Sequence, residues 1–137
     1  MVEDRITDGR RIAELLASEI DGRSDGELEY FAVANADRDV EPAVDGARAY
    51  DVVRSGDRIA RVFIHEDRVH LEFEAGRDVA AATAPDVGLR VRPKASTPPR
   101  TLVFVESGAE VKRATDVLQV VSRRLADTDS SDQSPSG

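Results

Sequence analysis

The sequence predicts a single α+β domain, in which an antiparallel sheet of five or six strands carries the N- and C-terminal helices on one face. The first observation is length, because a chain of 137 residues is the size of one ordinary domain. The second is the spacing of apolar residues near both ends, which recurs every three or four positions, as in amphipathic helices. The third is strict alternation around Val69, Leu71 and Phe73, which indicates an antiparallel strand with one buried face.

The N-terminal third is predicted to contain one helix, one strand and one long loop. Thr7 is the expected cap of a helix that ends at Gly22. The apolar residues of this helix share one side and are Ile12, Leu15, Leu16 and Ile20. Residues 28–36 (LEYFAVANA) are rich in β-branched and aromatic side chains and predict a strand. Residues 37–48 contain Asp, Pro and Gly and predict a loop.

Residues 49–76 are predicted to form three consecutive antiparallel strands. Ser55, Gly56 and Asp57 supply the first turn, and Glu66 with Asp67 supplies the second. The third strand alternates apolar residues with polar ones, which are expected on its wet face: Arg68, His70, Glu72 and Glu74.

The following segment is predicted to return to the sheet after a short helix. Residues 77–84 form that helix, which Pro85 stops because proline disrupts a helix interior. Residues 88–93 read as a short strand and residues 94–99 as a loop. Residues 100–106 (RTLVFVE) are apolar on both faces, so we expect a strand near the middle of the sheet.

A last helix completes the predicted domain, which spans residues 1–126. Ser107 and Glu110 have the spacing of a capping box. The apolar side of the helix consists of Val111, Ala114, Leu118, Val121 and Leu125. Residues 127–137 are acidic and Ser-rich and have no apolar surface to bury, so we expect a disordered tail.

Composition indicates the setting in which the protein works. Sixteen Asp and eleven Glu stand against seventeen Arg and only two Lys, and the net charge is −8. Such a surface stays hydrated in concentrated salt, which favours a halophile, although a GC-rich genome also raises Arg, Ala, Asp and Val. Cysteine is absent, so disulfides and thiolate sites are excluded. No signal peptide or membrane span is recognisable, and we expect a soluble cytoplasmic protein.

Two stretches resemble known proteins. MVEDRITDGRRIAELLASEIDG together with ARAYDVVRSGDRIARVFIHEDRVHLEF is similar to a group of small acidic haloarchaeal proteins of unknown function, over most of residues 1–126. This resemblance implies the habitat and a single domain, and no activity. A weaker similarity covers residues 57–121, where RIARVFI, RVHLEFEAG and RTLVFVES follow the order of elements in YjbR-like and YdhG-like small α+β domains.

The residue types that carry catalysis or hold cofactors form no strong pattern. His65 and His70 are the only histidines, and in HEDRVH they suggest a metal site or an acid–base pair. We expect the two on opposite faces of a hairpin, with a turn at Glu66 and Asp67 placing His65 across from Arg68. Nucleophile elbows and glycine-rich phosphate loops are missing, so the sequence predicts no catalytic residue, no metal and no cofactor.

Residues 87–105 stand out because they contain no acidic residue. They carry four cations, Arg90, Arg92, Lys94 and Arg100, which strand geometry places on one face. Two interpretations follow from this placement. The four side chains either pair with Glu72, Glu74 or Glu106 across the sheet, or they form a cationic binding patch.

The sequence therefore predicts a non-catalytic binding or interaction module in the cytoplasm of a halophilic archaeon. The expected ligand is a carboxylate of a protein partner or a phosphate-bearing metabolite, held bidentately by arginine. The alternative is a small nucleic-acid-associated regulator that uses the same patch. Four phosphate contacts would give a salt slope of about −3.6, so affinity from charge alone would collapse in concentrated salt. A third possibility is a small enzyme centred on the hairpin of His65 and His70.

Overall fold

We describe a computed structural model, which covers residues 7–22 and 26–132. In chain order the elements are α1 (Gly9–Gly22), a 3-10 turn η2 (Gly26–Tyr30), β1 (Phe31–Ala34), β2 (Ala47–Arg54), β3 (Asp57–Ile64), β4 (Val69–Phe73), α2 (Arg77–Asp86), β5 (Val91–Lys94), β6 (Arg100–Val105), a 3-10 turn η3 (Gly108–Glu110) and α3 (Val111–Asp132).

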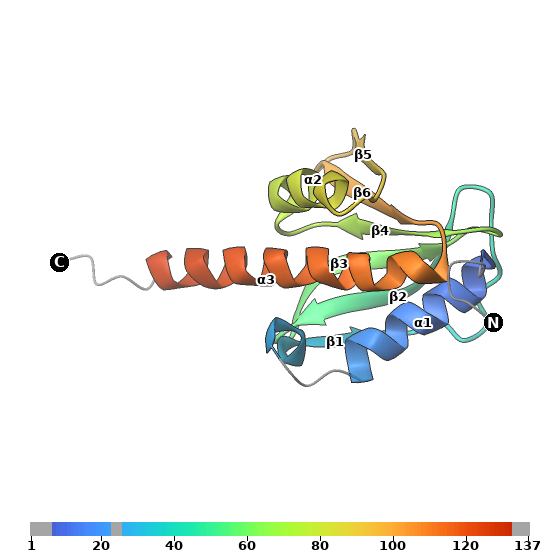
Figure 1. The fold of residues 1–137 in the computed structure, drawn as a ribbon, viewed down its shortest axis with the longest axis horizontal. Helices are drawn as coiled ribbons and strands as arrows, with labels where there is room; N and C mark the ends of the chain where they lie inside the picture. The colour runs from blue at the N-terminus through green and yellow to red at the C-terminus, as the bar shows by residue number, and fades with distance from the viewer. Residues whose placement is uncertain (1–6, 23–25, 133–137) are drawn as a thin grey trace.

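The six strands form one antiparallel sheet in the order β1-β2-β3-β4-β6-β5. Figure 1 shows α1 and α3 lying across one face of this sheet and α2 beside β5 and β6. The predicted fold class is confirmed, including the terminal helices. The expected turn at Ser55 and Gly56 is also confirmed, because these two residues join β2 to β3 with positive φ angles of 50° and 89°.

The core lies between the helices and the sheet. From α1, Ile12, Leu16 and Ile20 are fully buried, as the helical spacing predicted. They pack in one cluster with residues of the central strands and of α3, including Val62, Leu71, Phe73, Val103 and Leu118. This burial fixes which side of each strand faces the helices, and so leaves the opposite side for another role.

Both predicted helix caps differ in detail from the structure. Asp8, rather than Thr7, caps α1, because its carboxylate accepts hydrogen bonds from the backbone N–H groups of Arg10 and Arg11. At the other end, Glu110 accepts a hydrogen bond from the backbone N–H of Glu106, and the Ser107 side chain caps no described N–H. The expected capping box between Ser107 and Glu110 is therefore not formed, because neither of its two hydrogen bonds is present.

Three predicted boundaries also move. Leu28 to Tyr30 belong to the turn η2, so the predicted strand at 28–36 is shortened to β1. Pro85 lies inside α2 rather than stopping it, since the helix continues to Asp86. Helix α3 continues past residue 126 to Asp132, and residues 133–137 lie outside the described residues. The prediction that the chain beyond 126 adds nothing to folding stays a prediction.

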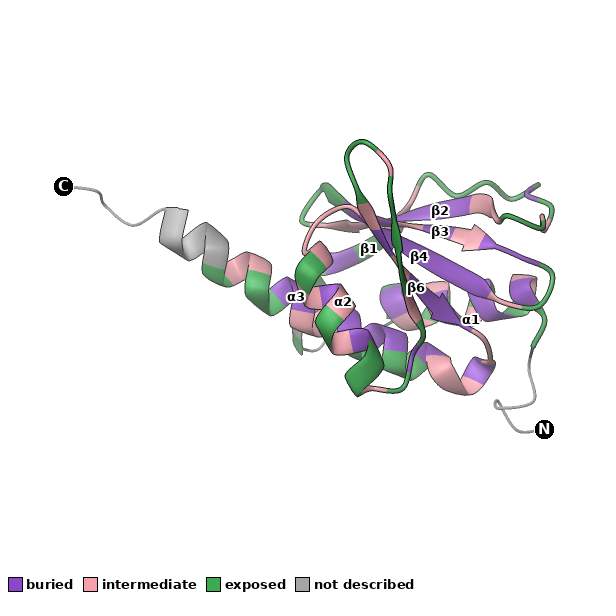
Figure 2. Cartoon of the chain, turned by 90° about the horizontal axis from the view of Figure 1, so that it is seen from above, coloured by how far each residue is buried: buried purple, intermediate pink, exposed green. Residues whose placement is uncertain are grey.

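The expectation that β4 has one wet face is wrong. All five of its residues are buried, including His70 and Glu72 at 3% and 5% exposure. Figure 2 shows β4 in the colour of buried residues along its length. The alternating polar residues satisfied the pattern of a half-exposed strand, but they are covered by neighbouring side chains on the face that carries no helix, which we call the helix-free face.

Candidate functional site

Strand register places polar and aromatic side chains in rows across the helix-free face. One row runs through the five strands from β2 to β5 and consists of Asp51, Arg61, Glu72, Leu102 and Arg92. The next row contains Phe63, His70 and Phe104. Because directly opposite residues of antiparallel strands share a face, residues far apart in the sequence meet here.

Three of the four cationic side chains in residues 87–105 have an acidic partner. Arg90 lies 2.8 Å from Glu106, Lys94 lies 3.1 Å from Glu72, and Arg100 lies 2.8 Å from Glu74. The interpretation that these side chains pair across the sheet is thus confirmed for Arg90, Lys94 and Arg100.

Arg92 differs from its neighbours. Its side chain is exposed on the edge strand β5, and among residues 7–22 and 26–132 the structure gives it no ion pair or hydrogen bond. The idea of a binding patch stays a prediction, and its centre moves to this one residue.

Three arginines on this face share the carboxylate of Glu74. Its carboxylate oxygens lie 3.0, 2.9 and 2.8 Å from the guanidinium nitrogens of Arg58, Arg61 and Arg100. Nearby, the buried carboxylate of Asp51 pairs with Arg48 at 3.3 Å. Carboxylates taken out of water need such partners, since an unpaired buried charge is strongly destabilising. These arginines therefore hold the face together and are not free to bind a ligand.

The two histidines touch, contrary to the expectation that they lie on opposite faces. Nε2 of His65 is 2.8 Å from Nδ1 of His70. The backbone N–H of His65 donates to the carbonyl of Arg68, as predicted, so these two residues are cross-strand partners and share a face. His70 lies two residues beyond Arg68 on the same face, which makes it the diagonal neighbour of His65. The prediction treated the five positions as one extended strand, whereas the expected turn itself puts Arg68, and with it His70, on the face of His65.

A chain of hydrogen bonds runs through the pair. Nδ1 of His65 is 2.9 Å from the carbonyl oxygen of Val44, and Nε2 of His70 is 3.4 Å from the carboxylate of Glu72. Both ends of this chain are acceptors, so its three contacts need three protons, whereas two neutral imidazoles carry only two. While both rings are neutral, two of the three contacts can therefore be hydrogen bonds.

His70 is enclosed by aromatic rings. It stacks on Phe63 at a centroid distance of 4.9 Å and lies 5.6 Å from the ring of Phe104. Burial lowers the pKa of His70 to about 4; the hydrogen bond to Glu72 opposes this shift, and the nearby charges of His65 and Lys94 add to it. His70 is therefore neutral at physiological pH.

A pocket of about 160 Å³ opens above this pair. Its lining comes from five separate segments and consists of Val44, Asp45, His65, Arg68, His70, Arg92, Leu102 and Phe104. The guanidinium groups of Arg68 and Arg90 lie over the ring of Phe104, 5.4 and 5.7 Å from its centroid. Beside them Val44 is 90% exposed, which is unusual for a large apolar side chain.

The nitrogens of both histidine rings are directed at partners within the protein. All four imidazole nitrogens are engaged in the chain from Val44 to Glu72, so neither ring presents a lone pair or a proton to the pocket. Within the described part of the chain, no group of three or more His, Cys, Asp or Glu side chains is placed to hold a metal ion. What the pocket offers is arginine beside apolar surface.

Sequence reasoning missed Arg68, Val44 and Phe104 as members of this site. The signal for Arg68 was present, since a two-residue turn at Glu66 and Asp67 puts it on the same face as His70. Val44 lies in the predicted loop at 37–48, and no sequence pattern indicates that this loop folds back over the histidines.

Comparison with known proteins identifies a family and no activity. The model of a family of unknown function, DUF7993, matches residues 1–134. No curated protein and no solved structure matches the chain. None of the described helices combines the length and apolar composition needed to cross a membrane. The haloarchaeal origin and the similarity to YjbR-like domains stay predictions.

Proposed function

The chain belongs to the DUF7993 family of unknown function, and from this premise we propose its function on the chemistry of the helix-free face. It is a non-catalytic binding module that docks an acidic segment of a protein partner against Arg92. The setting is the cytosol of a halophilic archaeon, as the excess of Asp and Glu and the scarcity of Lys suggest.

One observation carries this proposal: Arg92 has no partner among the described residues, whereas Arg90, Lys94 and Arg100 on either side of it are paired. An arginine left exposed beside apolar surface is typical of the centre of a protein interface. Its planar guanidinium group can hold a carboxylate through two parallel hydrogen bonds. Such a contact is weakened less by salt than a purely electrostatic attraction between the two charges.

Apolar groups around Arg92 favour a protein partner over a free ion. Val44 is exposed, Leu102 is half-buried, and both line the same pocket as Arg92. A peptide that alternates carboxylates with apolar residues can place one side chain against Val44 and another in the fork of Arg92.

The two alternatives have less support. A nucleic-acid surface needs several unpaired cations, yet most cations of this face pair with Glu72, Glu74 or Glu106. An acid–base enzyme needs an accessible histidine nitrogen. The ring nitrogens of His65 and His70 instead contact each other, the carbonyl of Val44 and the carboxylate of Glu72.

Nuclear magnetic resonance tests the proposal. A short peptide of alternating Glu and Leu, titrated into ¹⁵N-labelled protein in molar KCl, is expected to shift the signals of Val44, Leu102 and the Arg92 side chain. Arg92→Gln should weaken the peptide about tenfold or more, because a charge-assisted bidentate contact is lost.

The matched control is Arg113→Gln, which removes another exposed arginine, on α3. It should leave the peptide affinity unchanged. Shifts that map elsewhere, or equal affinities in the two variants, contradict the proposal.

A further inference from the structure

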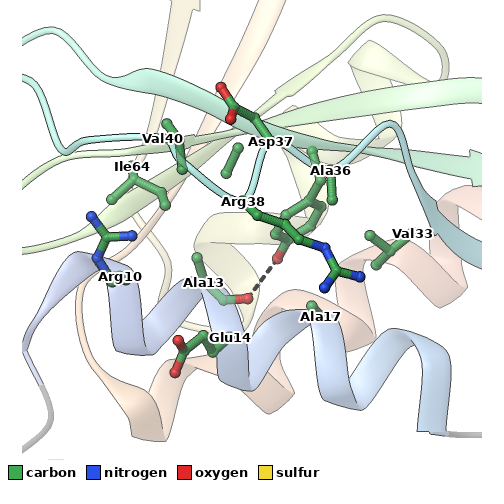
Figure 3. Close-up of a pocket in the computed structure, with 12 residues that line it drawn as sticks. Arg10, Ala13, Glu14, Ala17, Val33, Ala36, Asp37, Arg38, Val40 and Ile64 are labelled. Atoms are coloured by element: carbon green, nitrogen blue, oxygen red, sulfur yellow. Dashed lines mark hydrogen bonds between the residues drawn. The ribbon is translucent and has the colours of Figure 1, made fainter.

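A second cavity lies on the side of the sheet that faces α1, where α1 meets the segment joining β1 to β2. Its volume is about 200 Å³. The walls are small and apolar and come mainly from Ala13, Ala17, Val33, Ala36, Val40 and Ile64. Figure 3 shows α1 on one side of this cavity and the 36–40 segment on the other.

Alanines explain why the space is open. Ala13 and Ala17 lie one turn apart on α1, Ala36 faces them from the loop, and Ala49 of β2 also lines the space, so four of the positions around the cavity carry only a methyl group. The hydroxyl of Tyr50 reaches across to donate a hydrogen bond of 2.7 Å to the carbonyl of Ala13. Burial, helped by the charge of Asp21, raises the pKa of Tyr50, which keeps the hydroxyl neutral.

The mouth of the cavity is lined by charged side chains of both signs. In Figure 3 the guanidinium of Arg38 extends toward α1 near Ala17, whereas the carboxylates of Asp37 and Glu14 point away from the centre. Glu14 is bound by Arg11 at 3.2 Å, and Asp37 accepts a hydrogen bond from the backbone N–H of Asp39.

The two arginines at the mouth, Arg10 and Arg38, differ in whether their guanidinium groups already have a partner. Arg10 lies 3.6 Å from the exposed carboxylate of Glu41, a loose surface pair. Arg38 has no ion pair or hydrogen bond among residues 7–22 and 26–132. Its fork is thus the one cationic group beside the cavity whose donors are not already assigned within the described chain.

We propose that this cavity binds a small carboxylic acid, with a compact apolar body against the alanines and its carboxylate in the fork of Arg38. The complementarity is both chemical and steric. An apolar wall with one convergent cation matches a molecule with one charged end. A volume of about 200 Å³ suits a body the size of a single ring or a branched alkyl group, since an apolar cavity of about 150 Å³ can bind benzene. This inference is independent of the docking surface around Arg92.

The test uses benzoate as the probe and benzyl alcohol as its uncharged counterpart. Titration of ¹⁵N-labelled protein with benzoate is expected to shift signals of α1 and of residues 33–40, and to leave those of α2 in place. Arg38→Gln should weaken benzoate about tenfold and leave benzyl alcohol unchanged, because only the charge-assisted contact is removed.

Two further variants separate the cavity from the arginine. Ala17→Leu fills the space, so both probes should lose binding; Ala36→Leu serves the same purpose if the helix variant fails to fold. Arg113→Gln on α3 is the matched control, because Arg113 belongs to neither proposed site, and it should leave benzoate binding intact. Absence of benzoate shifts at millimolar concentration, equal affinity for both probes, or benzoate binding that survives both Arg38→Gln and Ala17→Leu would overturn the proposal.

Discussion

Gly46 shows how a single residue fits the loop over the histidine pair. Its backbone φ angle is +92°, a value that residues other than glycine rarely adopt. A Cβ atom here would lie 3.0 Å from Nε2 of His65 and from Cβ of Phe63, and 3.1 Å from Cε1 of His70. The hydrogen bond from His65 to Val44 therefore depends on a residue without a side chain two positions further on.

The first prediction compares two glycines with the same backbone strain. Gly46→Ala should lower the free energy of unfolding by about 2 kcal/mol or more, because it adds close contacts to an unfavourable φ angle. Gly56→Ala, at φ +89° with no atom within 4 Å of the new Cβ, should cost only the backbone term of about 1 kcal/mol. Urea denaturation measures both. Equal losses would mean that the loop does not pack on the histidines as described.

The second prediction concerns the pH dependence of stability. The pKa of His70 is about 4 in the folded protein against an ordinary 6.5, so between these pH values the unfolded chain binds a proton that the folded chain does not. Stability should therefore be level above about pH 6.5 and fall by about 3 kcal/mol on acidification toward pH 4.

His70→Phe isolates this effect from other titrating groups. The neighbours that bear on His70 are His65, Glu72 and Lys94, and these remain in the variant. The difference in unfolding free energy between wild type and variant should narrow or reverse in favour of the variant as the pH falls. A difference that stays constant from pH 7 to pH 4 is incompatible with a neutral buried His70.

At the scale of elements, the sequence allowed the helices, most strands and the first turn to be predicted, because apolar periodicity reports the face that packs on the core. It did not reveal that β4 is buried on both faces. The side chains of His70 and Glu72 are polar, and polar alternation looks the same whether water or a partner side chain covers it. Only the register of β4 with β3 and β6 brings Arg61, Phe63 and Phe104 over them.

The candidate site could also be predicted only in part. That Arg90, Arg92, Lys94 and Arg100 share a face could be predicted from their spacing. Which of them lacks an acid could not, because this depends on the position of each carboxylate across two neighbouring strands.

The third prediction ranks two ion pairs, Arg100 with Glu74 and Arg90 with Glu106, by their burial. Arg100 and Glu74 are each only 19% exposed, whereas the side chain of Arg90 is 70% exposed. Arg100→Gln should lower the free energy of unfolding by about 1 kcal/mol, since a half-buried carboxylate loses one of its partners. Arg90→Gln should cost only a few tenths of a kcal/mol. Chemical denaturation in low salt distinguishes them, and a larger loss for Arg90 would contradict the described packing.

At the scale of the whole molecule, the net charge of −8 opposes folding through repulsion among carboxylates. Screening of these surface charges tightens as salt rises, with a Debye length of about 3 Å at 1 M. The half-buried pairs around Glu74 are less accessible to ions than the exposed surface and should persist.

The fourth prediction follows from this balance. The melting temperature should rise as KCl increases from about 0.1 M to molar levels, because repulsion weakens while the half-buried pairs remain. Thermal denaturation at a series of KCl concentrations tests this expectation. A flat or falling curve would remove the physical basis for a halophilic setting.

The central claim is that the helix-free face recognises an acidic protein segment through Arg92 rather than nucleic acid through charge. Its most direct test is the affinity of the Glu-Leu peptide and of a single-stranded oligonucleotide for wild type and for Arg92→Gln, all measured in molar KCl. We predict that wild type binds the peptide, that Arg92→Gln weakens it about tenfold, and that the oligonucleotide does not bind either protein. Oligonucleotide binding in molar KCl, or peptide binding that Arg92→Gln leaves unchanged, would contradict the claim.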